Sequence, residues 1–277
     1  MCSAIEMDGA NISVVLQGAV DAEICTQIVK SVRLYLPRAE IVLSTWDGTD
    51  VGAMDYDVLV MNEDPGALKS LYRGSKEYVN NNINRQIVST RNGIRRASRE
   101  YVMKLRSDSV VTGLGFMEYA RKYLSDERYL CFEPRNPWGI FKGEYCLCDF
   151  WFLGKKDTLL ALWDIPLYVQ GNDVYAPLAE EYLVMCSYEE GYGEQDEETR
   201  YIVLLREKAV IIPAQKSGIK SLKYPRLNWF GDVCIRHSVI SHEDWKDING
   251  IASLKDHAII RIQYACGVAV MKIKEIV

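Results

Sequence analysis

The sequence lacks any apolar run near the ~20 residues that a membrane-spanning helix needs, and it shows no basic segment followed by a continuous hydrophobic stretch at its start. These absences exclude a helical integral membrane protein, so we expect a cytoplasmic protein with at most peripheral contact at the inner face of a membrane. Basic residues are not in excess either, because the formal net charge is -5. A nonspecific polyanion binder is therefore disfavoured, and nucleic acid is not expected as a partner.

Paired cysteines are also missing. The eight cysteines are scattered without a Cys-x-x-Cys pair, and in a chain of 277 residues they are expected to be reduced thiols of the core. Cys131, Cys146 and Cys148 are close in sequence, but no matching Cys or His pair follows at zinc-finger spacing. The sequence therefore predicts neither a disulfide framework nor a structural zinc site.

The glycine-rich phosphate-binding motifs are absent as well. The first predicted strand is followed by Gln17-Gly18-Ala19-Val20-Asp21, which is not Gly-x-Gly-x-x-Gly, and no Gly-x-x-x-x-Gly-Lys-Ser/Thr occurs anywhere. Both motifs place backbone amides around a phosphate. Dinucleotide binding and Walker-type binding are therefore disfavoured.

What the sequence does contain is an alternation of strand and helix patterns, which predicts an α/β fold with a mostly parallel sheet covered by helices on both faces. We expect one domain over residues 1–214 and a C-terminal appendage over 215–277, which would serve as a lid, an acceptor platform or an oligomer contact. The predicted strands are 12–16, 40–45, 56–61, 101–111, 129–132, 149–153 and 210–212, and the predicted helices are 24–36, 80–98, 114–124, 157–163, 178–188 and 197–208.

The predicted strand 101–111 carries an unusual set of charges. Side chains alternate along a strand, so Lys104, Arg106 and Asp108 should share one face. Two cations beside a carboxylate are costly on a covered face unless an anion or a metal meets them. The alternative is an edge strand whose wet face displays charges for solubility and protection from strand pairing.

Polar residues also follow the first two predicted strands. Parallel sheets bind ligands beyond the carboxyl ends of their strands, where Gln17, Gly18, Thr45 and Asp47 would join Asp108. This arrangement is typical of a nucleotide pocket, with Asp47 accepting from the ribose hydroxyls. Gln17, Thr45 and Asp47 could each instead only form a turn.

Five segments together resemble the WavE family of lipopolysaccharide-synthesis proteins, over roughly residues 10 to 190. The Asn-Arg-Gln and Lys-x-Arg-Ser-Asp sequences, in that order, are the most specific of them. The segments are Ile12–Gly18, Ala39–Trp46, Tyr56-Asp57 with Asp64-Pro65-Gly66, Asn84–Thr90 and Tyr101–Asp108.

The resemblance implies a single Rossmann-like domain of the GT-A type. Such an enzyme would be a glycosyltransferase, of hexosyltransferase type, that moves a sugar from a nucleotide sugar, UDP-linked by first choice, to a lipopolysaccharide core or lipid-linked oligosaccharide of bacterial polysaccharide biosynthesis. Inversion or retention at the sugar stays open, as does the oligomeric state.

The resemblance also implies a divalent cation, Mn²⁺ or Mg²⁺, held by an Asp-x-Asp at the end of a central strand. Asp108 matches the second aspartate, but Arg106 stands where the first would be. Two alternatives follow. Asp108 could anchor the metal with help from the diphosphate and waters, which is the version we expect, or Lys104 and Arg106 could neutralise the diphosphate directly.

Further site residues are expected from their positions. Arg85 and Gln86 would meet the donor from the first turn of a helix, unless they are only a solvated helix start. The general base is expected to be Glu180, then Glu181, then Asp149, although carboxylates in a first turn are also favoured by the helix dipole. His237 and His242 could complete a metal shell, or they could lie in surface turns.

Two other functions remain compatible with the sequence. A sugar-phosphate nucleotidyltransferase uses a similar sheet, but it usually needs a glycine- and arginine-rich loop after the first strand, and Gln17–Asp21 does not supply one. A noncatalytic nucleotide-sugar-binding protein is the other alternative. It would keep its biological role after Asp108→Ala.

Overall fold

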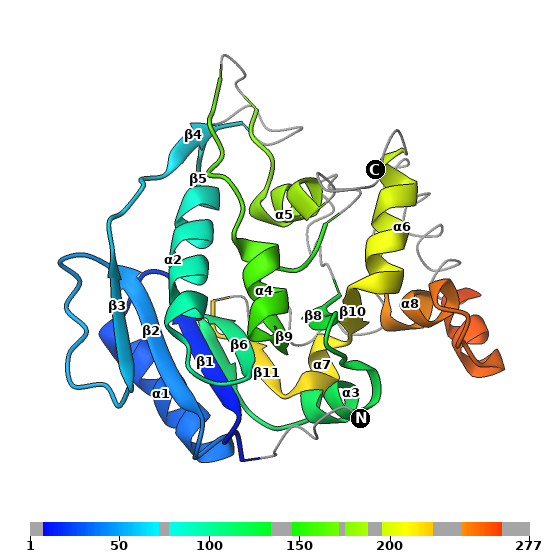
Figure 1. Ribbon diagram of the computed structural model, residues 1–277, viewed down its shortest axis with the longest axis horizontal. Helices are drawn as coiled ribbons and strands as arrows, with labels where there is room; N and C mark the ends of the chain where they lie inside the picture. The colour runs from blue at the N-terminus through cyan, green and yellow to red at the C-terminus, as the bar shows by residue number, and fades with distance from the viewer. Residues whose placement is uncertain are drawn as a thin grey trace, which may run out of the picture.

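The computed structural model describes residues 8–71, 78–133, 146–171, 175–187, 196–223 and 240–261. Its centre is a seven-stranded sheet with the order β10-β8-β9-β6-β1-β2-β3 (Figure 1). β9 runs antiparallel to both of its neighbours, β6 and β8, while the other neighbouring strands are parallel. These strands are β1 (Ile12–Gln17), β2 (Glu40–Trp46), β3 (Val58–Asn62), β6 (Tyr101–Arg106), β8 (Tyr129–Phe132), β9 (Trp151–Lys155) and β10 (Ala209–Ile212).

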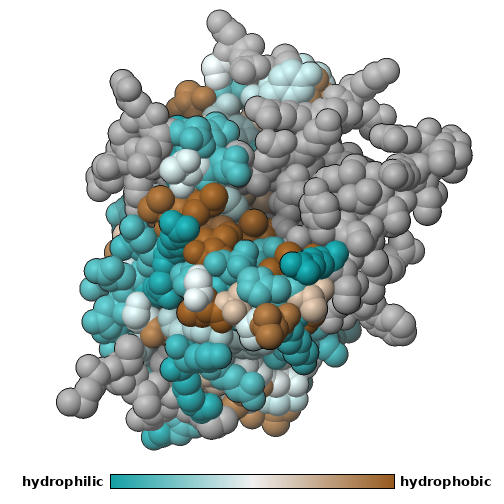
Figure 2. Space-filling view, turned by 90° about the vertical axis from the view of Figure 1, so that its right-hand side faces the viewer, coloured by the Kyte–Doolittle hydropathy of each residue, from teal (hydrophilic) through white to brown (hydrophobic). Residues whose placement is uncertain are grey.

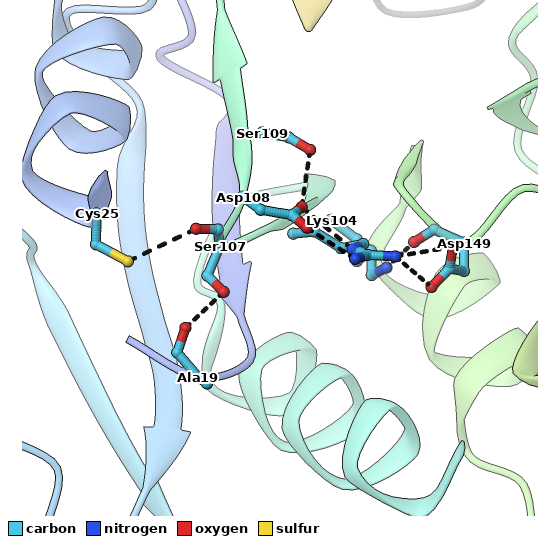
Figure 3. Close-up of polar contacts among 8 residues, drawn as sticks. Ala19, Cys25, Lys104, Ser107, Asp108, Ser109 and Asp149 are labelled. Atoms are coloured by element: carbon cyan, nitrogen blue, oxygen red, sulfur yellow. Dashed lines mark hydrogen bonds and ion pairs between the residues drawn. The ribbon is translucent and has the colours of Figure 1, made fainter. Parts of the chain in front are cut away.

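The predicted α/β class and the mostly parallel sheet are confirmed. The central strand β1 is buried along its whole length, as expected for a strand with helices on both faces of the sheet. α1 (Ala22–Tyr35) and α2 (Ile83–Arg96) cover opposite faces (Figure 3). The remaining helices of the described chain that the sequence predicted are α3 (Phe116–Tyr123), α4 (Lys156–Trp163), α5 (Ala179–Ser187) and α6 (Glu197–Glu207).

Gly93 lies in the middle of α2, where glycine is normally unfavourable. The structure supplies the reason, because a Cβ at this position would lie 2.4 Å from the Cγ1 of Val15 and 3.1 Å from the Cβ of Ser44. Glycine therefore lets α2 pack closely onto β1 and β2.

The predicted strand 101–111 is broken in two, which corrects our expectation. β6 ends at Arg106; the Ser107 amide still donates to the Gln17 carbonyl of β1 (3.1 Å), and the chain then turns at residues 107–108. β7 (Ser109–Val111) belongs to a separate antiparallel pair with β11 (Ile219–Ser221). Asp108 thus lies in the turn between two strands rather than on a strand.

Two stretches beyond residue 214 contact the sheet domain, around α7 and β11 and around α8. α7 (Ala214–Ser217) precedes β11, and the Leu222 amide donates to the Asp108 carbonyl (2.8 Å). α8 (His242–Ile248) buries Trp245, whose indole N–H donates to the carbonyls of Leu205 and Ala209. We predicted neither α7, α8 nor β11, and we also missed the small antiparallel pair of β4 (Leu68–Ser70) and β5 (Val79–Asn81).

None of the described helices is both long enough and apolar enough to cross a membrane. Where its residues are described, the face of the molecule on the α8 side is mainly hydrophilic, with apolar residues gathered near its centre (Figure 2).

Candidate functional site

Charged residues gather where β6 and β1 end, on the α2 side of the sheet. Arg106 is the last residue of β6 and lies in register with Gln17, the last residue of β1. Asp149 comes from the segment that leads into β9, while Gln86 and Glu180 come from the first turns of α2 and α5. We call Lys104, Arg106, Asp108, Asp149 and Glu180 the strand-end cluster.

Arg106 is the centre of this cluster. Its Nε and Nη2 donate to the two carboxylate oxygens of Asp108 at 3.2 and 2.8 Å, and its Nη1 lies 3.2 Å from Oδ2 of Asp149. The guanidinium also lies 4.2 Å from the ring centroid of Phe150. The side chains of Arg106 and Asp108 are 19% and 18% exposed, whereas Asp149 is 1% exposed. Burial opposes the charge of Arg106, but the charges of Asp149 and Asp108 outweigh it and raise its pKa.

Lys104 differs from our expectation that it contacts a donor. It is fully buried, donates a hydrogen bond to the Asp149 carbonyl, and lies 5.1 Å from the ring centroid of Trp163. Burial lowers its pKa to about 8, although the Asp149 charge opposes this shift. The structure therefore makes Lys104 an internal support of Asp149 and leaves it no direct access to a ligand.

Asp149 and Glu180 form a hydrogen-bonded pair of carboxyl groups. Burial alone would raise the pKa of Asp149, but the charges of Arg106 and Lys104 outweigh burial and lower it. Burial raises the pKa of Glu180 to about 8, and the neighbouring Asp149 charge adds to this shift. The proton of the pair therefore resides on Glu180. The Gln86 side chain also donates to Asp149, while its own Oε1 is buried without a partner among the described residues.

The residues expected to bind the donor lie at the ends of β1 and β2, but two of them are inside the protein. Gln17 is buried and accepts a hydrogen bond from the Ser89 hydroxyl (2.8 Å). Thr45 is fully buried, and within the described chain its hydroxyl finds no partner. Gly18 has a φ of +119°, which favours glycine, and a Cβ there would lie 3.1 Å from the Ser107 Oγ. Figure 3 shows Ser107 beside Ala19, to whose carbonyl it donates.

Two other expected donor residues face outward. Asp47 is exposed, and its amide donates to the Asn62 carbonyl (2.8 Å). Arg85 is tied to Asp64 through its Nε and Nη2, at 2.7 and 2.6 Å. Asp47 is thus accessible, whereas Arg85 already has a carboxylate partner.

Glu181 and His242 have structural partners. Glu181 accepts a hydrogen bond from the Leu178 amide (2.9 Å) at the start of α5. His242 is buried beside Tyr119 and Trp245, and its Nδ1 lies 2.6 Å from the Ile211 carbonyl. Burial lowers the pKa of His242 to about 4. His237 lies outside the described residues.

The residues present do not fit a divalent metal at Asp108. Both carboxylate oxygens of Asp108 already accept hydrogen bonds from a cation, the Arg106 guanidinium. Across the described ranges, no three His, Cys, Asp or Glu side chains are arranged to hold a metal ion. The sequence had indicated this conflict, because Arg106 replaces the first residue of an Asp-x-Asp.

We did not predict the role of Phe150. The aromatic run after Asp149 was the available signal, but it could not reveal that one of its rings would lie under Arg106. Sequence alternation likewise could not show that Asp149 joins the cluster, since it approaches from a separate segment.

Residues 12–190 match a family described as WavE lipopolysaccharide synthesis. No curated protein matches the sequence. One similar solved structure is a Drosophila β-1,4-galactosyltransferase 7 mutant in complex with manganese, UDP-Gal and xylobiose. It is 12% identical with a TM-score of 0.32, and the match covers 55% of this chain and 51% of the other. The present chain thus spans about half the length of that galactosyltransferase.

Two further structures align over more of the chain. A glycosyltransferase involved in glycosylation of the major capsid of the virus PBCV-1 is 13% identical with a TM-score of 0.42, over 79% of this chain and 89% of the other. A 4-diphosphocytidyl-2C-methyl-D-erythritol synthase from Anaerococcus prevotii is 12% identical with a TM-score of 0.39, over 86% and 96%. At these TM-scores we draw nothing about activity from the likenesses.

Proposed function

Because the chain belongs to the WavE lipopolysaccharide synthesis family, we propose that it is a glycosyltransferase that uses a nucleotide-diphosphate sugar as its donor. A UDP-sugar is the first candidate. The proposed acceptor is a hydroxyl group of a lipopolysaccharide core or of a lipid-linked oligosaccharide. Contact with the inner face of the bacterial membrane would follow from such an acceptor.

The observation that carries the proposal is the position of Arg106. Its partly exposed guanidinium lies where two neighbouring parallel strands end, which is where ligands bind in sheets of this kind. Two carboxylates hold it from different segments, so its orientation is set before a ligand arrives. A cation fixed in this way stabilises the charge that develops on a departing diphosphate.

Glu180 is the acid best suited to act on the acceptor. Asp149 is buried against two cations, and Glu181 is engaged with the Leu178 amide. Glu180 is only partly buried, and its pKa of about 8 makes it a stronger base than an ordinary glutamate. A base whose pKa lies near the working pH is the most effective in proton transfer.

The proposed reaction forms and breaks one bond each at the sugar. The acceptor oxygen attacks the anomeric carbon, the bond from that carbon to the phosphate oxygen breaks, and the nucleoside diphosphate leaves with the electron pair. The ionised carboxylate of Glu180 accepts the proton of the acceptor hydroxyl. Asp47, exposed at the end of β2, is proposed to accept from the ribose hydroxyls.

The test is donor hydrolysis without acceptor, measured over a panel of UDP-, GDP- and CDP-sugars. We expect slow release of one nucleoside diphosphate, and we expect Arg106→Gln and Glu180→Ala to abolish it. Arg95→Gln is the matched control, because Arg95 forms a similar pair with Asp164 (2.8 Å) on an exposed surface at the other end of α2. Formation of NTP from pyrophosphate and nucleotide sugar would instead identify a nucleotidyltransferase.

A further inference from the structure

We infer that Arg106 takes the place of the divalent metal, so that this site binds the diphosphate of its donor without a metal ion. The inference rests on the proposed function and specifies that Arg106 supplies the positive charge for the donor diphosphate. It follows from the contacts of Asp108, the carboxylate that we expected to hold the metal.

Arg106 contacts both carboxylate oxygens of Asp108, the atoms that a metal ion would need as ligands. A guanidinium fork that contacts both oxygens of a carboxylate is among the strong charge-assisted hydrogen bonds, and its directions match those oxygens. Here both contacts are present, and the two side chains are about four-fifths shielded from water. A metal ion at Asp108 would have to displace a cation that is already in place.

Asp149 holds the Arg106 guanidinium in position even when Asp108 does not contact it. It contacts the third guanidinium nitrogen, Nη1, and it is itself fixed by its hydrogen bonds with Gln86 and Glu180. A diphosphate oxygen can therefore replace the Asp108 carboxylate on Nε and Nη2 while Asp149 keeps the guanidinium in position. Arg has five N–H donors, so further hydrogens of Nη1 and Nη2 are available to the same ligand.

The backbone of the turn that carries Asp108 is fixed separately from its side chain. The Leu222 amide donates to the Asp108 carbonyl (2.8 Å), and the pairing of β7 with β11 includes the next residue, Ser109. Displacing the Asp108 carboxylate from Arg106 therefore leaves these backbone contacts intact.

The experiment is calorimetric titration of the full chain with UDP, GDP and CDP, once with excess EDTA and once with Mn²⁺. We expect the preferred nucleotide to bind with the same affinity, within about twofold, in both buffers. Arg106→Lys keeps the charge but loses the fork, and it should weaken binding in EDTA by about tenfold or more. Asp108→Asn removes the carboxylate at unchanged shape, so binding in EDTA should persist or tighten.

Opposite results would overturn the inference. If the wild-type protein binds a nucleoside diphosphate only with Mn²⁺, and Asp108→Asn abolishes that gain, Asp108 is a metal ligand and the inference is wrong while the proposed function stands. If no nucleoside diphosphate binds in either buffer, the proposed function fails as well. Thermal unfolding of each variant verifies folding, and Asp108→Asn still decides the question if Arg106→Lys does not fold. Arg95→Gln should bind like the wild type.

Discussion

Glu180 and Asp149 form a hydrogen-bonded pair of carboxyl groups whose pKa values are shifted in opposite directions. Asp149 stays ionised because Arg106 and Lys104 lie beside it, even though burial opposes its charge. Burial and the Asp149 charge raise the pKa of Glu180 to about 8. Through Asp149, the charge of Arg106 therefore affects the protonation of Glu180, the proposed base.

The first prediction concerns stability as a function of pH. The pKa of Glu180 rises from 4.5 to about 8 on folding, so the folded protein holds this proton more tightly than the unfolded chain. Its contribution to stability is complete below pH 4.5 and is lost as the pH rises towards 8. Glu180→Gln mimics the protonated form at every pH. We expect this variant to lose less stability than the wild type between pH 5 and pH 8.

Urea unfolding at several pH values measures this difference. Glu181→Gln is the control, because it makes the same chemical change one residue away. Parallel pH profiles for the wild type and Glu180→Gln would contradict the raised pKa of Glu180.

The second prediction concerns Asp149. Asp149→Asn keeps the shape but removes the charge that compensates Lys104 and Arg106, and Lys104 is fully buried. Loss of one partner of a buried ion pair typically costs ~3–5 kcal/mol. We expect a destabilisation of that order, measured by chemical denaturation.

Asp164→Asn is the matched control for Asp149→Asn. It breaks a contact with Arg95 in which both side chains are more than two-fifths exposed, and exposed pairs contribute ~0–1 kcal/mol. Equal effects of the two substitutions would show that the strand-end cluster is as well solvated as the surface.

The third prediction concerns Gly218, which joins α7 to β11. Its φ is +81°, and a Cβ would lie 2.4 Å from backbone atoms of Gly113. Gly218→Ala should therefore cost at least ~2 kcal/mol, since the backbone strain adds to a clash that no side chain can relieve. Gly250→Ala has a similar φ of +68° with no atom within 4 Å, so it should cost only ~1 kcal/mol. Thermal unfolding distinguishes the two, and an equal cost would mean that strain alone matters at Gly218.

The fourth prediction concerns Gly93 in α2. Alanine normally stabilises a helix interior relative to glycine by ~1 kcal/mol, but here its Cβ would meet Val15 at 2.4 Å. Overpacking of this kind typically costs ~1–3 kcal/mol, so we expect Gly93→Ala to destabilise. Gly171→Ala, with open space around the added Cβ, should be neutral or slightly stabilising. A more stable Gly93→Ala would show that α2 can move away from β1.

The sequence by itself determined the elements that depend on local pattern. The strands β1, β2 and β8 and the helix α1, whose apolar positions recur at every fourth residue, were predicted close to their observed bounds. These patterns require only that one face or both faces of the strand or helix are buried. Arg106 in place of an acid was also visible in the sequence, although we still expected Asp108 to hold a metal.

Only the tertiary structure decided how distant segments meet. Alternation predicted an unbroken strand 101–111, but hydrogen bonds to β1 on one side and to β11 on the other divide it at the turn that carries Asp108. Lys104 and Arg106 share a face as predicted, yet one is buried under Asp149 and the other is partly exposed. The difference depends on where Asp149 and Trp163 fold back over β6, which is a matter of long-range packing that no local pattern encodes.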